Sequence, residues 1–373
     1  MVTSLLSARC AIPNYFTRAA YQRSLTTHRT AVVVGATSGI GQACAHRLAE
    51  QGFLVIAVGR DNATTTSSSS SSSPDAPSER AKTVVESLTR ASTNAASQLL
   101  EHDDNNNNKS TNSPDSPLPP PTHEFIACNA FSLRDVQLAA KTILAKHDKI
   151  DALIMTQGMA TTQGFTPTAE GNDEKLTLHY YSRMAWAWLL LPALKKSTMP
   201  AVVLSILSGG VHSPYNNYAQ DPSLKNSYSI KNAADAAGYY NDLGLDHLAR
   251  HCNNDDDNKK IAFCHASPGF VNTSWGKEFH PLLRSMVRLF QPLGRNPADC
   301  AEYMLGATVL ARDAGDDIPH NHIDDANESG GVYIIGQNGE PKHLTKQHTP
   351  EARAFIWKHT VEVLHKAGID IPS

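Results

Sequence analysis

Short apolar runs alternate with longer segments of helical spacing along most of the chain. Seven runs are predicted strands: Ala31–Val34, Phe53–Val58, Glu124–Cys128, Ala152–Thr156, Ala201–Leu207, Ile261–His265 and Gly331–Ile335. Helices are predicted between and after them, at Gly39–Gln51, Leu133–His147, Glu170–Lys196, Ile230–Arg250, Pro297–Arg312 and Pro350–Lys366. This alternation predicts an α/β fold, a doubly wound parallel sheet of about seven strands with helices on both faces.

The alternation is interrupted between residues 62 and 122. Asn62–Ser78 contains a run of seven serines, and His102–Thr122 contains four consecutive asparagines and a proline cluster. Such segments cannot bury enough apolar surface to fold, so we expect them to be disordered. A helical pattern, Glu79–Glu101, lies between them. We therefore expect one domain over residues 30–373 that carries a low-complexity insertion at 62–122.

Composition narrows the class of protein. A formal net charge of -3 over 373 residues gives no basic field for nucleic acid, and Ala185–Leu194 is too short an apolar stretch to span a membrane. The six cysteines include no CxxC pair and are expected to be reduced thiols. Residues 1–29 hold four arginines and no acidic residue, which is typical of a mitochondrial or plastid transit peptide. The alternative is a basic tail on a cytoplasmic protein.

A glycine-rich turn follows the first predicted strand directly and opens the first predicted helix. Its sequence is Gly35-Ala-Thr-Ser-Gly-Ile-Gly41. A strand–loop–helix unit of this kind presents backbone N–H groups and a helix N-terminus to a pyrophosphate. The sequence therefore predicts a dinucleotide site. The residues expected to form it here are Gly35, Thr37, Ser38, Gly39, Ile40 and Gly41.

The GxxxGxG spacing resembles the short-chain dehydrogenase/reductase family, and the resemblance extends over nearly the whole chain outside residues 1–30 and the insertion. It implies a Rossmann-type NAD(P)-binding fold. After the sixth strand, Ser267-Pro-Gly-Phe-Val-Asn-Thr273 is similar to the family's PGxxxT segment, which lies against the nicotinamide. The resemblance carries further cofactor contacts to Asn129, Gly158, Pro268, Gly269, Val271 and Thr273.

The end of the second strand bears on which dinucleotide is bound. NAD-selective sheets place a carboxylate there to accept hydrogen bonds from the ribose hydroxyls. Here Gly59 occupies that position and Arg60 follows, while Asp61 comes one position late. A guanidinium suits a 2′-phosphate, so we expect NADP, with NAD the less favoured alternative.

The catalytic region departs from the family pattern. The resemblance implies a Ser, and Ser208 after the fifth strand fits it, with Ser205 as competitor. It also implies a Tyr and a Lys spaced YxxxK, but no Tyr here has a Lys four residues later. The nearest pair, Tyr228 and Lys231, is one residue short. A different alignment places Ala234 and Gly238 at these positions.

Another family residue, an assisting Asn, is replaced by His179. An interior histidine without a catalytic role is the alternative interpretation of that position.

Two functions follow from these observations. The first is an oxidoreductase that transfers hydride between NADP(H) and a carbonyl/alcohol substrate, with Ser208, Tyr228 and Lys231 as catalytic residues. An amphipathic stretch from Trp275 to Leu289, the substrate lid in relatives, favours a bulky hydrophobic substrate. The second is a catalytically impaired NADP-binding protein that acts as a sensor or scaffold. In either case the resemblance implies a homodimer or homotetramer.

Overall fold

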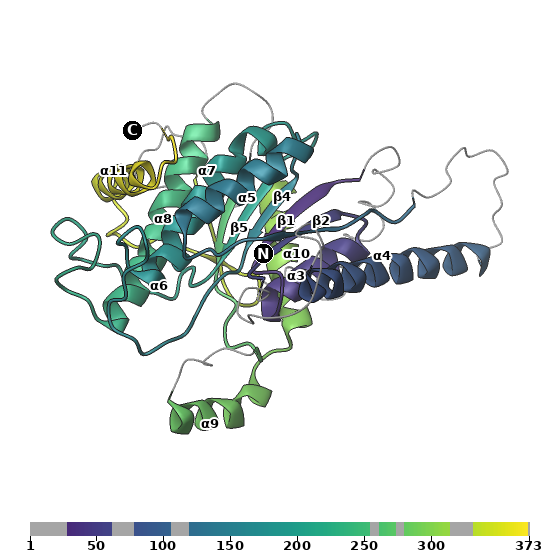
Figure 1. Ribbon diagram of the computed structural model, residues 1–373, viewed down its shortest axis with the longest axis horizontal. Helices are drawn as coiled ribbons and strands as arrows, with labels where there is room; N and C mark the ends of the chain where they lie inside the picture. The colour runs from purple at the N-terminus through teal and green to yellow at the C-terminus, as the bar shows by residue number, and fades with distance from the viewer. Residues whose placement is uncertain are drawn as a thin grey trace, which may run out of the picture.

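The computed structural model describes residues 28–61, 78–105, 119–253, 261–273, 280–313 and 331–371. An eight-stranded sheet with the order β3-β2-β1-β4-β5-β6-β7-β8 forms its centre (Figure 1). The strands are β1 (Thr30–Val34), β2 (Leu54–Gly59), β3 (Glu124–Ala127), β4 (Ala152–Met155), β5 (Val202–Ile206), β6 (Ala262–Ala266), β7 (Tyr333–Ile335) and β8 (Pro341–Lys342). All pair in parallel except β7 and β8, which are antiparallel.

The longer helices are α3 (Gly39–Glu50), α4 (Glu79–Asn105), α5 (Leu133–Lys146), α7 (Ser182–Leu194), α8 (Ile230–Asn253), α9 (Pro281–Phe290), α10 (Pro297–Asp313) and α11 (Pro350–Lys366). Short helices are α6 (Glu174–Leu176), the π-helix η3 (Thr177–Tyr181) and the 3-10 helix η4 (Gln291–Leu293). The doubly wound sheet expected from the sequence is confirmed. The strand β8 and the division of Glu170–Lys196 into α6, η3 and α7 were not foreseen.

Alternate residues of each strand supply two hydrophobic cores, one on each face of the sheet. On β1, Val32 and Val34 pack with residues of α5, α7, α8 and α11, while Ala31 and Val33 pack with residues of α3, α4 and α10. Because β1 is covered on both faces, all five of its residues are buried, instead of every second one. The loop that follows β1 is held at its start by hydrogen bonds from the Gly35 and Ala36 N–H groups to the Val58 carbonyl at 2.9 and 3.2 Å.

The helix within the insertion belongs to the packed fold. The side chains of Val84 and Leu88 on α4 lie in the same core as α3, and Ser87 on α4 is hydrogen-bonded to His46 on α3 at 3.1 Å. In Figure 1 the far part of α4 extends beyond the sheet. The insertion therefore contributes its helical stretch to the core.

Several expectations fall outside the described residues. These include nearly all of the basic segment 1–29, the serine run, and most of the polar stretch His102–Thr122. They stay predictions. Within the part of the chain that the structure describes, no helix is long and apolar enough to cross a membrane.

Candidate functional site

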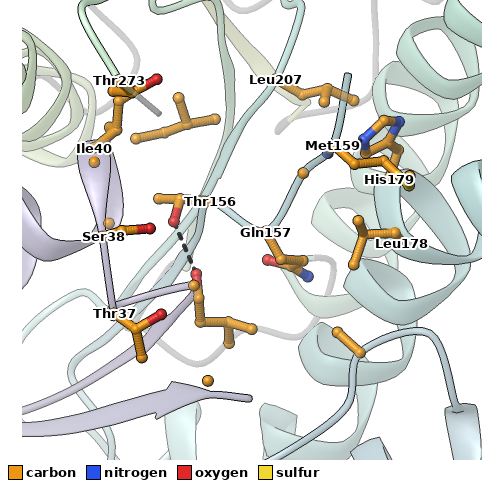
Figure 2. A pocket seen from close by; sticks show the side chains of 18 of the residues that line it. Thr37, Ser38, Ile40, Thr156, Gln157, Met159, Leu178, His179, Leu207 and Thr273 are labelled. Atoms are coloured by element: carbon orange, nitrogen blue, oxygen red, sulfur yellow. Dashed lines mark hydrogen bonds between the residues drawn. The ribbon is translucent and has the colours of Figure 1, made fainter. Parts of the chain in front are cut away.

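A cavity of about 630 Å³ opens at the carboxyl ends of the central strands (Figure 2). The order of the sheet reverses direction between β1 and β4, and the crevice above such a point is where α/β sheets bind ligands. The cavity is lined by the loops after β1, β2, β3, β4, β5 and β6, and by residues of η3 and α7. Twelve of the thirteen predicted cofactor residues line it: Gly35, Thr37, Ser38, Gly39, Ile40, Gly41, Arg60, Gly158, Pro268, Gly269, Val271 and Thr273.

The turn after β1 needs its glycines for steric reasons. A Cβ at Gly35 would lie 2.6 Å from Thr156 Oγ1, and one at Gly41 would lie 2.3 Å from the same atom. Gly39 begins α3 with a φ of +58°. The first turn of α3 contains no acidic residue and leaves backbone N–H groups without helical acceptors. This helix end can accept the negative charge of a diphosphate.

The segment after β6 closes the other side of the cavity. Gly269 has a φ of +69°, and a Cβ placed on Gly39 would lie 3.0 Å from Thr273 Cγ2. The segment is held in place by Arg295, whose backbone N–H donates to the Phe270 carbonyl and whose carbonyl accepts the Asn272 N–H, both at 2.9 Å. The polypeptide thus leaves the cavity wall after Thr273 and pairs again with this segment at Arg295, with α9 and η4 in between.

The side chain at the end of β2 carries positive charge into the cavity lining. Arg60 is exposed there, with its guanidinium carbon 5.9 Å from the ring centroid of Phe131. Neither Asp61 nor any other carboxylate is among the residues that line the cavity. Asn129 does not line it either, because its side-chain oxygen accepts the Phe131 N–H at 3.3 Å and stabilises the local turn.

His179 lies on η3 and points into the cavity beside Met159 (Figure 2). Its Nε2 accepts the Met159 N–H at 3.0 Å, so the ring proton of the neutral form is on Nδ1. Burial, and then the charges of Arg183 and Lys175, lower the pKa of His179 to about 3. A histidine that is neutral at physiological pH can donate a hydrogen bond here but cannot act as a general base with a matched pKa.

The cavity floor also contains a buried cation that the sequence interpretation missed. Arg183 on α7 is fully buried, and its guanidinium donates to the carbonyls of Met155, Gln157 and Ile206 at 2.6–3.2 Å. It also donates to the Ser205 hydroxyl at 2.6 Å. Burial lowers the pKa of Arg183 to about 9, so it is still charged at neutral pH. A lone arginine in the apolar segment Ser182–Leu194 was the available sequence signal.

Ser208 follows β5 but does not line the cavity. Its N–H donates to His265 Nε2 at 3.2 Å, and its carbonyl accepts from His212 Nδ1 at 2.9 Å. Its Oγ is buried without a hydrogen-bond partner. A Cβ at Gly238 would lie 2.6 Å from that oxygen. Gly238, which the alternative alignment places at the Lys position, therefore packs directly on Ser208.

Tyr228 and Lys231 have separate polar partners. The helix α8 begins at Ile230, so Tyr228 precedes it, and its hydroxyl donates to the Gln163 carbonyl at 3.2 Å. The side chain of Lys231 is 75% exposed and forms an ion pair with Asp235. Neither residue lines the cavity. Their catalytic pairing stays a prediction, and this geometry does not support it.

Comparison with known proteins agrees with this arrangement. Residues 29–103 match the short chain dehydrogenase family. The chain is 34% identical over 150 residues to Oxidoreductase AN1596 of Emericella nidulans, a match that covers 40% of this chain and 42% of that protein. It is 21% identical over 235 residues to Short-chain dehydrogenase/reductase SAT2 of Stachybotrys chartarum, covering 58% of this chain and 65% of that protein. The chain thus spans less than two thirds of the length of these relatives.

A solved structure of similar fold covers almost the whole chain. An uncharacterized protein from Mycobacterium Paratuberculosis superposes with a TM-score of 0.52 and 18% identity, covering 92% of this chain and 95% of that one. At this identity the likeness concerns the fold alone. The family match covers β1 to α4, and the glycine turn there lines one cavity together with the segment after β6. The chain is therefore similar to the short chain dehydrogenase family over residues 29–103, and its sheet has the doubly wound Rossmann-type order.

Proposed function

We propose that the protein is an NADP(H)-dependent oxidoreductase acting on a carbonyl/alcohol pair. The observation that carries the proposal is the common cavity. In it the N-terminus of α3, the exposed Arg60 and the segment Pro268–Thr273 line one space of about 630 Å³ without a carboxylate. A bound NADPH would supply the hydride.

Different residues of the cavity lining suit different parts of the cofactor and substrate. The N–H groups at the start of α3 suit the diphosphate, and Arg60 suits a 2′-phosphate because a guanidinium forms charge-assisted, bidentate contacts with phosphate. Thr273 lies beside Ile40 at the start of α3 and offers a hydroxyl, while His179 lies on the opposite side of the cavity, beside Met159. Phe270, which is 46% exposed, and Leu207 add apolar surface to the lining, which favours a hydrophobic substrate.

Calorimetry with NADPH and NADH on the full chain tests the cofactor assignment. We expect NADPH to bind more tightly, and Arg60→Ala to weaken NADPH about 10- to 100-fold while changing NADH binding by less than about threefold. Arg90→Ala, at an exposed arginine on α4, is the matched control and should change neither. Equal affinities for the two dinucleotides, unaffected by Arg60→Ala, would contradict the NADP assignment.

One observation favours a second candidate, an NADP-binding sensor or scaffold without turnover. Tyr228, Lys231 and the Ser208 hydroxyl all lie outside the cavity lining. The two functions separate when NADPH consumption is followed with a panel of aliphatic and aromatic ketones. Oxidation that Ser208→Ala or Tyr228→Phe abolishes supports the enzyme. Tight NADPH binding with no oxidation of any panel member supports the binding protein.

A further inference from the structure

Three side chains from distant parts of the chain converge on a point outside the cavity lining. His212 is in the loop after β5, Asp242 is on α8, and His348 precedes α11. Both His212 Nε2 and His348 Nε2 lie 3.1 Å from the same oxygen, Asp242 Oδ2. The three side chains are 2–4% exposed. The structure thus holds two imidazole nitrogens and one carboxylate oxygen together in the interior.

The other polar atom of each of these side chains has a partner of its own. His212 Nδ1 lies 2.9 Å from the Ser208 carbonyl, and Asp242 Oδ1 lies 2.5 Å from His265 Nδ1. His348 Nδ1 lies 2.9 Å from the Thr345 hydroxyl. Partners of this kind are what metal-ligating histidines and carboxylates have in proteins, because they fix the tautomer and the orientation of the ligand.

The hydrogen-bond partners of the two histidines determine which of their nitrogens carry protons when the cluster contains no metal. The Ser208 carbonyl and the Asp242 carboxylate are both acceptors, so His212 must carry protons on both nitrogens and be a buried cation. The single oxygen Asp242 Oδ2 must also accept two imidazole N–H groups. A divalent cation removes both requirements. It takes the lone pairs of the two Nε2 atoms and the charge of the carboxylate, while His212 Nδ1–H still donates to Ser208.

We propose that His212, Asp242 and His348 bind a divalent transition-metal cation, with Zn²⁺ the best match to this ligand set. Zn²⁺ binds imidazole nitrogen at about 2.0–2.1 Å and carboxylate oxygen at about 2.0–2.2 Å. At tetrahedral angles these bond lengths separate neighbouring ligand atoms by roughly 3.3 Å, close to the 3.1 Å found for both His–Asp pairs. The ligand atoms all lie within 4.8 Å of one another, so a small closure of the two rings would bring all three to bonding distance of one ion.

One contact must change when the metal binds. The Thr345 N–H lies 3.0 Å from His348 Nδ1, which fits the metal-free tautomer. In the metal-bound form Nδ1 carries a proton, and the Thr345 hydroxyl at 2.9 Å or carbonyl at 3.3 Å can accept it. The cation would join the loop after β5, the helix α8 and the segment before α11. It would thereby stabilise the Ser208 backbone that His212 holds.

The direct test is metal binding by the purified full chain, with no need for a substrate. The chain is first treated with a chelator, and the chelator is then removed. Zn²⁺ is titrated calorimetrically at about pH 7.5, where protons compete little with the metal for the histidines. Bound zinc is counted by elemental analysis. We expect one Zn²⁺ per chain, a rise in Tm on adding Zn²⁺, and visible absorption typical of tetrahedral Co²⁺ when cobalt is substituted.

Variants assign the ligands. Asp242→Asn and His348→Gln should each weaken Zn²⁺ binding by about 100-fold or more, since even the loss of an outer partner costs 10- to 100-fold. Asp148→Asn, at an exposed position in the loop after α5 and outside the cluster, is the matched control and should bind as the unmodified chain does. If Asp242→Asn does not fold, His348→Gln and the unmodified chain decide the question. No stoichiometric zinc at about 100 μM free metal, or binding that both variants retain, would overturn the proposal.

Discussion

The side chain of Thr156 occupies the space that Gly41 leaves open. Its hydroxyl donates to the Val34 carbonyl at 3.0 Å, and a Cβ at Gly41 would lie 2.3 Å from that hydroxyl oxygen (Figure 2). The same Cβ would lie 2.3 Å from the Gly35 carbonyl oxygen, which is backbone and cannot rotate away. The end of β4 and the beginning of α3 are therefore packed in direct contact at this point.

Gly41→Ala should consequently destabilise the protein although alanine favours helices. We expect the free energy of unfolding to fall by about 1–3 kcal/mol, because overpacking a rigid contact outweighs the gain in helix propensity. Urea denaturation followed by circular dichroism measures this change. Gly164→Ala is the control, since nothing lies within 4 Å of a Cβ there. Equal stability of the two variants would show that the loop after β1 can yield.

Replacing the buried guanidinium of Arg183 should lower the free energy of unfolding more than Gly41→Ala does. Arg183→Met removes the donors of the Met155, Gln157 and Ile206 carbonyls at the cavity floor. Leaving these buried acceptors unpaired should lower the free energy of unfolding by about 3 kcal/mol or more. The exposed Arg134 on α5 provides the comparison, and Arg134→Met should change stability by less than about 0.5 kcal/mol. A near-neutral Arg183→Met variant would mean that the carbonyls find other donors.

The acid limb of the stability curve should depend on Asp221. This carboxylate accepts the N–H groups of Lys225, Asn226 and Ser227 at 2.7–2.9 Å. Burial alone would raise the pKa of Asp221, but these hydrogen bonds outweigh burial and lower it. A folded-state pKa below the unfolded value gives stability that is present above about pH 4 and is lost as the pH falls through the folded pKa.

Asp221→Asn should therefore lower the free energy of unfolding at pH 7 by about 1–3 kcal/mol, and the difference from the unmodified chain should shrink at acid pH. Urea denaturation between about pH 3 and pH 7 measures this, with Asp148→Asn, at an exposed position, as reference. A difference that stays constant across this range would contradict the role given to the Asp221 charge.

His179 should not titrate in the physiological range. Its pKa of about 3 follows from burial and from the neighbouring Arg183 and Lys175 charges. The Cε1–H resonance of His179, assigned by its loss in His179→Gln, should keep a constant chemical shift between about pH 5 and pH 8. A midpoint near 6.5 would show that the ring is solvated, and His179 would then become a candidate general base.

Local sequence was sufficient where one short segment determines a structure by itself. The turn Gly35–Gly41 needs its glycines for contacts within the first crossover and with Thr156, and its spacing pointed to six of the residues that line the cavity. The bounds of the seven predicted strands agree with the structure to within one or two residues, because each strand is a short apolar run that is visible by itself. Asn129 lies outside the cavity lining, because a side chain that accepts a hydrogen bond within its own turn looks, in sequence, like one that faces a ligand.

What the sequence could not supply are relationships between distant segments. The buried Arg183 is paired by carbonyls at the ends of β4 and β5 and in the loop after β4, which lie 20 to 30 residues away along the chain. Tyr228 and Lys231 are close in sequence, but α8 begins between them, and their side chains have different partners, the Gln163 carbonyl and Asp235. The convergence of His212, Asp242 and His348 depends on how α8 and α11 pack, which no local pattern contains.

The backbone pairing of Phe270 with Arg295 bears on how the segment between them could be altered by evolution or by protein engineering. Backbone hydrogen bonds join Arg295 to the segment Phe270–Asn272, which lies on the other side of α9 in the sequence. The two ends of the α9 segment are therefore held together whatever residues lie between them. Segments of other length or composition could be exchanged there without displacing β6 or α10. The residues of α9 and η4 could therefore be redesigned while the glycine turn after β1 keeps its structure.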